Sequence, residues 1–171
     1  MMYTATLQTD VSFAVRYPRG GATGMPVREC FSEMPIGRGI CIKEGENVAI
    51  LSYGTIGNHV TNASKILSEE GIEIGHYNMR FVKPLDTELI SEIMENYDAI
   101  ITIEDATRVG GFGSAVAEYM ATVPSRVPLK IMGVPDALVE HGTQAELYSE
   151  VGLDSESIVR QVKEMLVIVN S

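Results

Sequence analysis

A chain of 171 residues in which 45% are hydrophobic has the length and composition of one folded domain with one sizeable core. Its 23 acidic residues outnumber its 13 lysines and arginines, which gives a formal net charge of −10. Because this charge repels phosphate, it argues against binding to nucleic acid or an anionic membrane, although one focused arginine can still hold a small anion.

The start of the chain differs in character from the rest. Residues 1–8 have the pattern of a helix end, residues 11–17 that of a strand, and residues 20–38 are rich in glycine and proline, as linkers are. A strand without partners followed by a linker predicts that residues 1–19 are the remnant of a preceding domain, including its last strand. The main domain is then predicted over residues 39–171.

Short apolar runs alternate with amphipathic helical patterns through this main domain. Strands are expected at residues 39–43 (an edge strand of unreadable direction), 47–53, 72–80, 99–104 and 129–134. The first helix is expected after Gly54, with Gly71 as its left-handed cap, and the second begins at Asp86 as N-cap. A third follows the glycine-rich turn 110–114 and runs to Met120, and two more begin at Thr143 and Asp154. Such alternation predicts an α/β fold of three layers, with helices on both faces of a parallel sheet.

No targeting or membrane segment is visible in the sequence. Residues 1–10 lack the basic and apolar regions of a signal peptide, and no apolar run is long enough to span a bilayer. Cys30 and Cys41 form neither a CxxC pair nor a metal-binding spacing, as is typical of reduced thiols. We therefore expect a soluble cytoplasmic protein.

The segment RYPRG brings Arg16 and Arg19 together around a proline. Arginine presents paired donors that match the oxygens of a phosphate, so this segment is a candidate anion site. The alternative is that both arginines are solvated on the linker.

Other polar residues have weaker functional signals. The turn GGFGS lacks the GxGxxG spacing and a Walker lysine, so tight packing explains its glycines better than phosphate binding does. Glu104 and Asp105 are candidates for acid–base chemistry, but at a strand end they are as well explained as facing solvent or a partner subunit. His141, just before a helix, is expected to cap it or to form a hydrogen bond.

No metal site and no catalytic residue is predicted within the chain. His59 and His76 stand alone, without neighbours at metal-binding spacing. The GDG motif and downstream asparagine that hold Mg²⁺ and a diphosphate are missing as well. The residues alone predict a doubly wound domain and leave its function open.

Several ordered segments nevertheless resemble the C-terminal part of the 1-deoxy-D-xylulose-5-phosphate synthase family, which is transketolase-like. They are RYPRG (16–20), MPIGRG (34–39), EGENVAILSYGT (44–55), MRFVKPLD (79–86), TIEDATRVGGFGSAV (102–116) and GVPDALVEHGTQAELYSEVGLD (133–154). RFVKPLD alone also suits transketolases and the beta subunits of 2-oxoacid dehydrogenases. PIGRG together with PDALVEHGTQAEL is more specific to the synthases.

The resemblance implies a reaction carried by thiamine diphosphate and Mg²⁺, which condenses pyruvate with glyceraldehyde 3-phosphate and releases CO₂. The product, 1-deoxy-D-xylulose 5-phosphate, feeds isoprenoid, thiamine and pyridoxal synthesis. The resemblance also implies that the cofactor binds N-terminal and middle domains lying before this chain, so that this chain alone binds no cofactor and is inactive. The C-terminal domain would be a five-stranded mixed sheet with one antiparallel strand, supporting a homodimer, and residues 1–19 would end the pyrimidine-binding domain.

One site residue follows from the resemblance. Arg19 corresponds to the arginine of RYPRG that holds the phosphate of the aldehyde substrate, whereas Arg16 has no such counterpart. Relatives often have EEN or EEH where this chain has Glu104, Asp105 and Ala106, which weakens a catalytic role for that turn. A transketolase or 2-oxoacid dehydrogenase domain, or a free-standing dimerisation or binding module, remains an alternative.

Overall fold

The computed structural model describes residues 1–17 and 30–171, which divide into two units, Met1–Ile36 and Gly37–Ser171. The first unit contains a short helix, α1 (Met2–Thr6). The backbone N–H of Met34 donates to Thr4 Oγ1 at 2.8 Å, and the rings of Tyr3 and Phe31 stack at 6.0 Å. These contacts link the two described segments of this unit.

The strand predicted for residues 11–17 is wrong, because these residues form no strand. A strand needs a partner to receive its backbone hydrogen bonds, and the described residues of the first unit contain no other strand. Arg19 lies outside the described residues, with most of the predicted linker. The assignment of residues 1–19 to a preceding domain stays a prediction.

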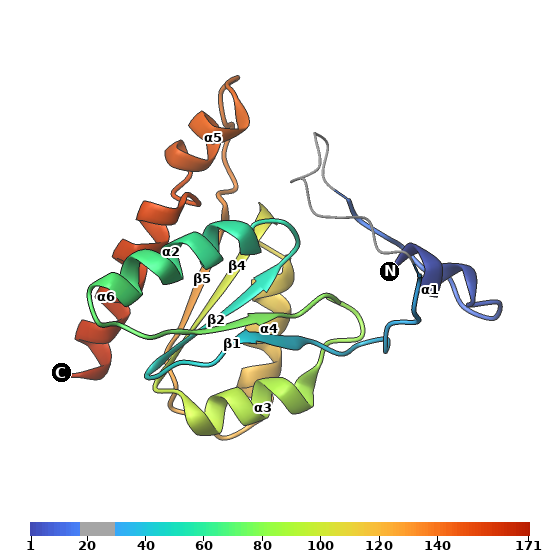
Figure 1. The fold of residues 1–171 in the computed structure, drawn as a ribbon, viewed down its shortest axis with the longest axis horizontal. Coiled ribbons are helices and arrows are strands. Elements are labelled where there is room, and N and C mark those ends of the chain that lie inside the picture. Colours follow the sequence, from blue (N-terminus) through green and yellow to red (C-terminus); the bar gives the residue numbers. More distant parts are fainter. Residues whose placement is uncertain (18–29) are drawn as a thin grey trace. The chain divides into compact units, whose positions relative to one another are not determined.

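The second unit is built on a five-stranded sheet (Figure 1). Its strands are β1 (Ile40–Lys43), β2 (Val48–Tyr53), β3 (Gly75–Asn78), β4 (Ala99–Thr107) and β5 (Leu129–Val134). They lie in the order β1-β3-β2-β4-β5, with β1 antiparallel to β3 and all other neighbours parallel. The predicted mixed sheet with one antiparallel edge strand is confirmed.

Helices cover both faces of this sheet, as the strand–helix alternation predicts (Figure 1). One face packs against α2 (Gly57–Glu69) and α6 (Ser155–Val169), and the other against α3 (Thr87–Asn96) and α4 (Phe112–Thr122). Val48 and Ile50 of β2 pack in the core beneath α2 and α6, whereas Ala49 and Leu51 pack in the core beneath α3 and α4. Because successive side chains of a strand point to opposite faces, a strand covered on both sides is apolar throughout.

The helix ends follow the predicted capping signals. The Asp86 carboxylate accepts the N–H of Leu89 at 3.2 Å, and that of Asp154 accepts the N–H of Ser157 at 2.8 Å. Gly71 ends α2 in the left-handed region with a φ of 78°. Thr143 forms a capping box with Glu146 at the start of α5 (Gln144–Glu150).

Two strand boundaries and one cap differ from the prediction. β3 is shorter than residues 72–80, and β4 continues past Glu104, pairing Thr107 with Val134 beyond an irregularity in the ladder. His141 is exposed and does not cap α5, because Thr143 already does so. None of the helices in the described part of the chain is long and apolar enough to cross a membrane.

Candidate functional site

The carboxyl ends of the parallel strands β2, β3, β4 and β5 meet at one edge of the sheet. β2 has β3 on one side and β4 on the other, so the chain reverses its direction of winding between β2 and β4. In open α/β sheets, ligands bind at the carboxyl ends beside such a reversal. The polar side chains at this edge are therefore the first candidates for a site.

Glu104 is the most buried acid at this edge, with 2% of its surface exposed. Its Oε1 atom accepts the backbone N–H of Gly113 in the first turn of α4 at 2.9 Å. Helix N-termini offer free N–H groups and a positive dipole end, and phosphate-binding folds hold their anion there. Here the chain's own carboxylate takes that position, so Glu104 serves the fold. The interpretation that Glu104 faces solvent is wrong.

The glycines of the GGFGS turn are explained by this packing. A Cβ atom on Gly111 would lie 2.5 Å from Glu104 Oε1, and one on Gly113 would overlap Ile131 and lie 2.7 Å from Thr102 Oγ1. Contacts under 3 Å force neighbouring atoms to move. Glycine at both positions lets α4 lie against Glu104 and β5, which confirms the packing interpretation of this turn.

Asp105, His59 and His76 also contact other side chains of the fold. The Tyr148 hydroxyl donates to Asp105 Oδ2 at 3.5 Å, and the His59 ring lies edge-on to the Tyr148 ring at 5.2 Å. His76 is 3% exposed, with its Nε2 atom 3.0 Å from Ser52 Oγ, and burial lowers its pKa to about 4. His76 is therefore a neutral, buried side chain.

Arg80, just after β3, is a functional candidate that the sequence alone does not single out. Its backbone is in the left-handed region, with a φ of 56°, and its N–H donates to Asn78 Oδ1 at 3.1 Å. Nη2 donates weakly to the carbonyl oxygen of Gly39 at 3.4 Å, while the buried Nε has no hydrogen-bond partner among the described residues. Strained backbone and an unpaired buried donor together mark a position under a constraint other than folding.

The carboxylate nearest to Arg80 is already used by other donors. Asp86 is 5% exposed and accepts the N–H groups of Gly39 and Leu89 at 2.8 and 3.2 Å, and Nη1 of Arg38 at 3.3 Å. Burial lowers the pKa of Arg80, and the charge of Asp86 opposes that shift without reversing it. The Arg80 guanidinium therefore has the unmet donor and the partial burial that suit an oxyanion.

Arg38, unlike Arg80, forms an ion pair at the surface, with Glu88. Arg38 Nη1 contacts Glu88 Oε2 at 2.5 Å, and the pKa of Arg38 is raised by that hydrogen bond first and by the charges of Glu88 and Asp86 next. Because Arg38 and Glu88 are largely exposed, this contact contributes little to stability. The charge of Arg38 is already paired with two carboxylates through Nη1, which leaves Arg80 as the better candidate.

Arg19 is the site residue that the family resemblance predicts. Arg16 lies in the first unit, and Arg19 lies outside the described residues. The role of Arg19 in binding phosphate stays a prediction. The one sequence signal that pointed toward Arg80 is its position in MRFVKPLD, which carries the family resemblance without naming a role.

Known proteins resemble this chain along most of its length. Residues 37–158 match the family model "Transketolase, C-terminal domain". Among curated relatives, 1-deoxy-D-xylulose-5-phosphate synthases from Parabacteroides distasonis and Cytophaga hutchinsonii are 44% and 45% identical over 96% of this chain. The chain spans 26% of the length of each of these relatives.

Solved structures agree on the fold. One titled "Split gene transketolase, inactive beta4 tetramer" matches with a TM-score of 0.73 and 34% identity, over 82% of this chain and 47% of the other. A transketolase mutant from Pichia stipitis matches at 0.57 with 15% identity, over 76% of this chain and 18% of the other, which supports the fold alone. The family match, the five-stranded mixed sheet and the ordered motifs agree: the chain belongs to the transketolase C-terminal domain family and is homologous to the C-terminal part of 1-deoxy-D-xylulose-5-phosphate synthases.

Proposed function

We propose that this chain is the C-terminal domain of a cytoplasmic, homodimeric enzyme that condenses pyruvate with glyceraldehyde 3-phosphate to 1-deoxy-D-xylulose 5-phosphate and CO₂. The product would supply isoprenoid, thiamine and pyridoxal synthesis. The observation that carries the proposal is identity of 44% and 45% to synthases of that name over 96% of the chain. Within the longer protein, this chain would support the other domains and the dimer, and would present arginines to the phosphate of the aldehyde.

Thiamine diphosphate and Mg²⁺, which such an enzyme requires, do not fit the residues of this chain. In residues 1–17 and 30–171, no three His, Cys, Asp or Glu side chains gather to hold a metal ion. The free N–H groups at the start of α4, which suit a diphosphate, face the carboxylate of Glu104. We therefore assign the cofactor to the N-terminal and middle domains and derive no step through it here.

The role that remains for this chain is to bind and orient the phosphorylated substrate. Arg19 is proposed from its motif, and Arg80 from its unpaired, buried Nε and strained backbone. A guanidinium group can hold two oxygens of a phosphate and so keep the aldehyde at a fixed distance from the reacting carbon. Pyruvate has no phosphate, so its binding should depend little on either arginine.

Kinetics of the longer protein test this role. Arg80→Met, which keeps a long apolar stem, and Arg19→Ala should each lower kcat/KM for glyceraldehyde 3-phosphate by roughly thirty- to a thousandfold, the loss of a charge-assisted pair. The KM for pyruvate should stay near wild type, and Arg→Lys should recover part of the loss. Arg126→Ala, at an exposed arginine before β5, is the control. Unchanged aldehyde kinetics in both variants would remove the proposed role.

The reaction itself is tested by product analysis. The longer protein, given thiamine diphosphate, Mg²⁺, pyruvate and glyceraldehyde 3-phosphate, should release CO₂ and form the deoxy sugar phosphate. The structural match to a split-gene transketolase favours one alternative, a two-carbon transfer between sugar phosphates. Transfer from xylulose 5-phosphate to ribose 5-phosphate, without turnover of pyruvate, would establish that alternative instead.

The isolated 171-residue chain should be inactive and should not bind thiamine diphosphate. Isothermal titration calorimetry with the cofactor and Mg²⁺ measures this directly. Binding at about micromolar strength would show that the cofactor site lies in this chain and would contradict the proposal.

A further inference from the structure

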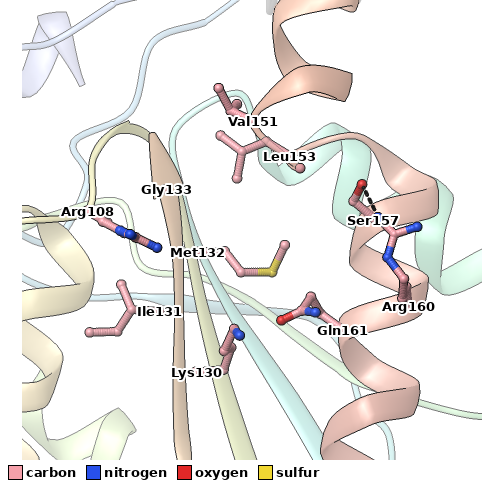
Figure 2. Close-up of a pocket in the computed structure, with 11 residues that line it drawn as sticks. Arg108, Lys130, Ile131, Met132, Gly133, Val151, Leu153, Ser157, Arg160 and Gln161 are labelled. Atoms are coloured by element: carbon pink, nitrogen blue, oxygen red, sulfur yellow. Dashed lines mark hydrogen bonds between the residues drawn. The ribbon is translucent and has the colours of Figure 1, made fainter. Parts of the chain in front are cut away.

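A second cluster of positive charge lies beside the outer edge of β5 and includes Arg108, just after the carboxyl end of β4. A pocket of about 190 Å³ there is lined by residues of the β4–α4 loop, β5, the α5–α6 turn and α6 (Figure 2). Its lining includes three cationic side chains and no aspartate or glutamate, in a chain whose net charge is −10. Such a local reversal of charge focuses anions toward the pocket.

The three cations that line the pocket come from three different elements: Arg108 from the loop after β4, Lys130 from β5 and Arg160 from α6, where its side chain runs toward Ser157 (Figure 2). Lys130 lies on the same face of β5 as Met132, which packs into the core under α6. Neither Arg108 nor Lys130 forms an ion pair with any residue in the described part of the chain. Their charges are therefore available to a ligand.

Two of the cations are held in place by the fold. The backbone N–H of Arg108 donates to the carbonyl oxygen of Val134 at 3.0 Å, and a Cβ on Gly133 would lie 3.0 Å from Arg108 Cβ, so glycine lets this residue approach β5. Arg160 Nη2 donates to Ser157 Oγ at 2.9 Å, and Ser157 is 5% exposed. The Arg160 guanidinium, which is held by Ser157 before binding, loses less entropy on binding.

Asp154, the N-cap of α6, is an acid whose charge interacts with that of Arg160. Burial raises the pKa of Asp154, but hydrogen bonds from Ser157 and Ser149 and the charge of Arg160 outweigh this effect and lower it. Asp154 thus stays ionised and neutralises part of the charge of Arg160. Arg108 and Lys130 still leave an excess of positive charge around the pocket.

The volume limits the size of the ligand. The pocket has a volume of about 190 Å³. That suits one phosphate group with a short carbon chain or a second phosphate, and it is below the roughly 300 Å³ at which pockets for larger organic ligands begin. We propose that the pocket between β5 and α6 binds a phosphate-bearing small anion through Arg108, Lys130 and Arg160.

The test uses amide chemical shifts of the ¹⁵N-labelled 171-residue chain, titrated at constant ionic strength with inorganic phosphate, pyrophosphate and glycerol 3-phosphate. Amides of β5 and of residues 151–153 should shift and saturate. Pyrophosphate should bind more tightly than phosphate because it can contact more than one cation. Comparison with glycerol 3-phosphate separates free phosphate from a phosphate ester as the preferred form.

Matched variants test whether the charges that line the pocket, and not the net charge of the chain, determine the affinity for pyrophosphate. Lys130→Gln and Arg108→Gln should each weaken pyrophosphate binding about tenfold or more, the loss of one charge-assisted contact. Lys65→Gln removes the same charge from an exposed position on α2 and should change the affinity less than about twofold. The unliganded spectra show whether each variant is folded.

Several results would overturn the proposal. They are shifts that do not saturate by about 50 mM ligand, shifts confined to the surroundings of Arg38 and Arg80, or equal weakening in Lys65→Gln. Tight binding of an acidic peptide without any response to phosphate would also replace it with a protein contact at the β5 edge. None of these measurements depends on enzyme activity, so the outcome is independent of the proposed synthase function.

Discussion

Buried polar side chains of the second unit satisfy the backbone and one another. Glu104 accepts an N–H group of α4, Asp86 accepts the N–H groups of Gly39 and Leu89, and His76 pairs with Ser52. Each such pair offsets the cost of removing a polar group from water. Arg80 Nε and Thr102 Oγ1 depart from this rule, because neither buried atom has a hydrogen-bond partner among the described residues. At the scale of residues, Arg80 is the candidate for binding, because it combines the unpaired atom with a positive charge and a left-handed backbone.

The buried His76 predicts a dependence of stability on pH. Its pKa is about 4 in the folded protein, against an ordinary value of 6.5, so between these values the unfolded chain binds the proton more readily. The free energy of unfolding should therefore fall as the pH drops from about 6.5 to about 4. From pH 7 to pH 5, His76 should account for a loss of about 2 kcal/mol.

Urea unfolding at pH 7 and pH 5 measures this effect by comparing the wild-type chain with His76→Gln. The variant should lack the contribution of His76, so its stability should fall less between the two values. His141→Gln makes the same change at an exposed position and is the control. An equal pH dependence in wild type and His76→Gln would mean that the buried histidine does not control this loss.

At the scale of elements, the Glu104 carboxylate occupies the start of α4, where other folds bind an anionic ligand. Glu104→Gln keeps an oxygen that can accept the Gly113 N–H but removes the negative charge, so we expect a loss of about 1 kcal/mol. Glu104→Ala removes the acceptor and leaves a cavity, and should cost about 3 kcal/mol. Denaturant unfolding measures both.

The control for this prediction is Glu118→Gln, which changes an exposed glutamate of α4 in the same way. That variant should stay within about 0.5 kcal/mol of wild type. If Glu104→Ala were no more costly than Glu118→Gln, the hydrogen bond to Gly113 would not stabilise the start of α4.

The elements of the second unit were predictable because their signals are local. Apolar runs such as residues 48–53 and capping residues such as Asp86 and Thr143 need only their own neighbours in sequence. The strand predicted at residues 11–17 failed because a strand depends on a partner, which no local pattern supplies. Arg80 and the burial of Glu104 were not predictable for the same reason: a left-handed backbone and a contact with Gly113 arise only when distant segments meet.

At the scale of the whole molecule, charge and exposed apolar surface act in opposite directions. The net charge of −10 makes copies of the chain repel one another. The edge strand β1 nevertheless exposes 39% of Ile40 and 48% of Ile42, and edge strands present unpaired backbone groups. Two copies related by a two-fold axis could join these edges as an isologous contact. Self-association should then depend on salt.

The chain should sediment as a monomer at low salt and form a dimer as screening shortens the reach of its net charge. Ile42→Lys places a charge on the edge of β1 and should keep the chain monomeric at all salt concentrations. Val167→Lys makes the same kind of change at an exposed apolar residue of α6, with 67% of its surface exposed, and should leave the dimer intact. Sedimentation velocity across a salt series separates these outcomes. A dimer abolished by Val167→Lys and retained by Ile42→Lys would move the interface from the β1 edge to α6, and a monomer under all conditions would contradict the homodimer for this chain alone.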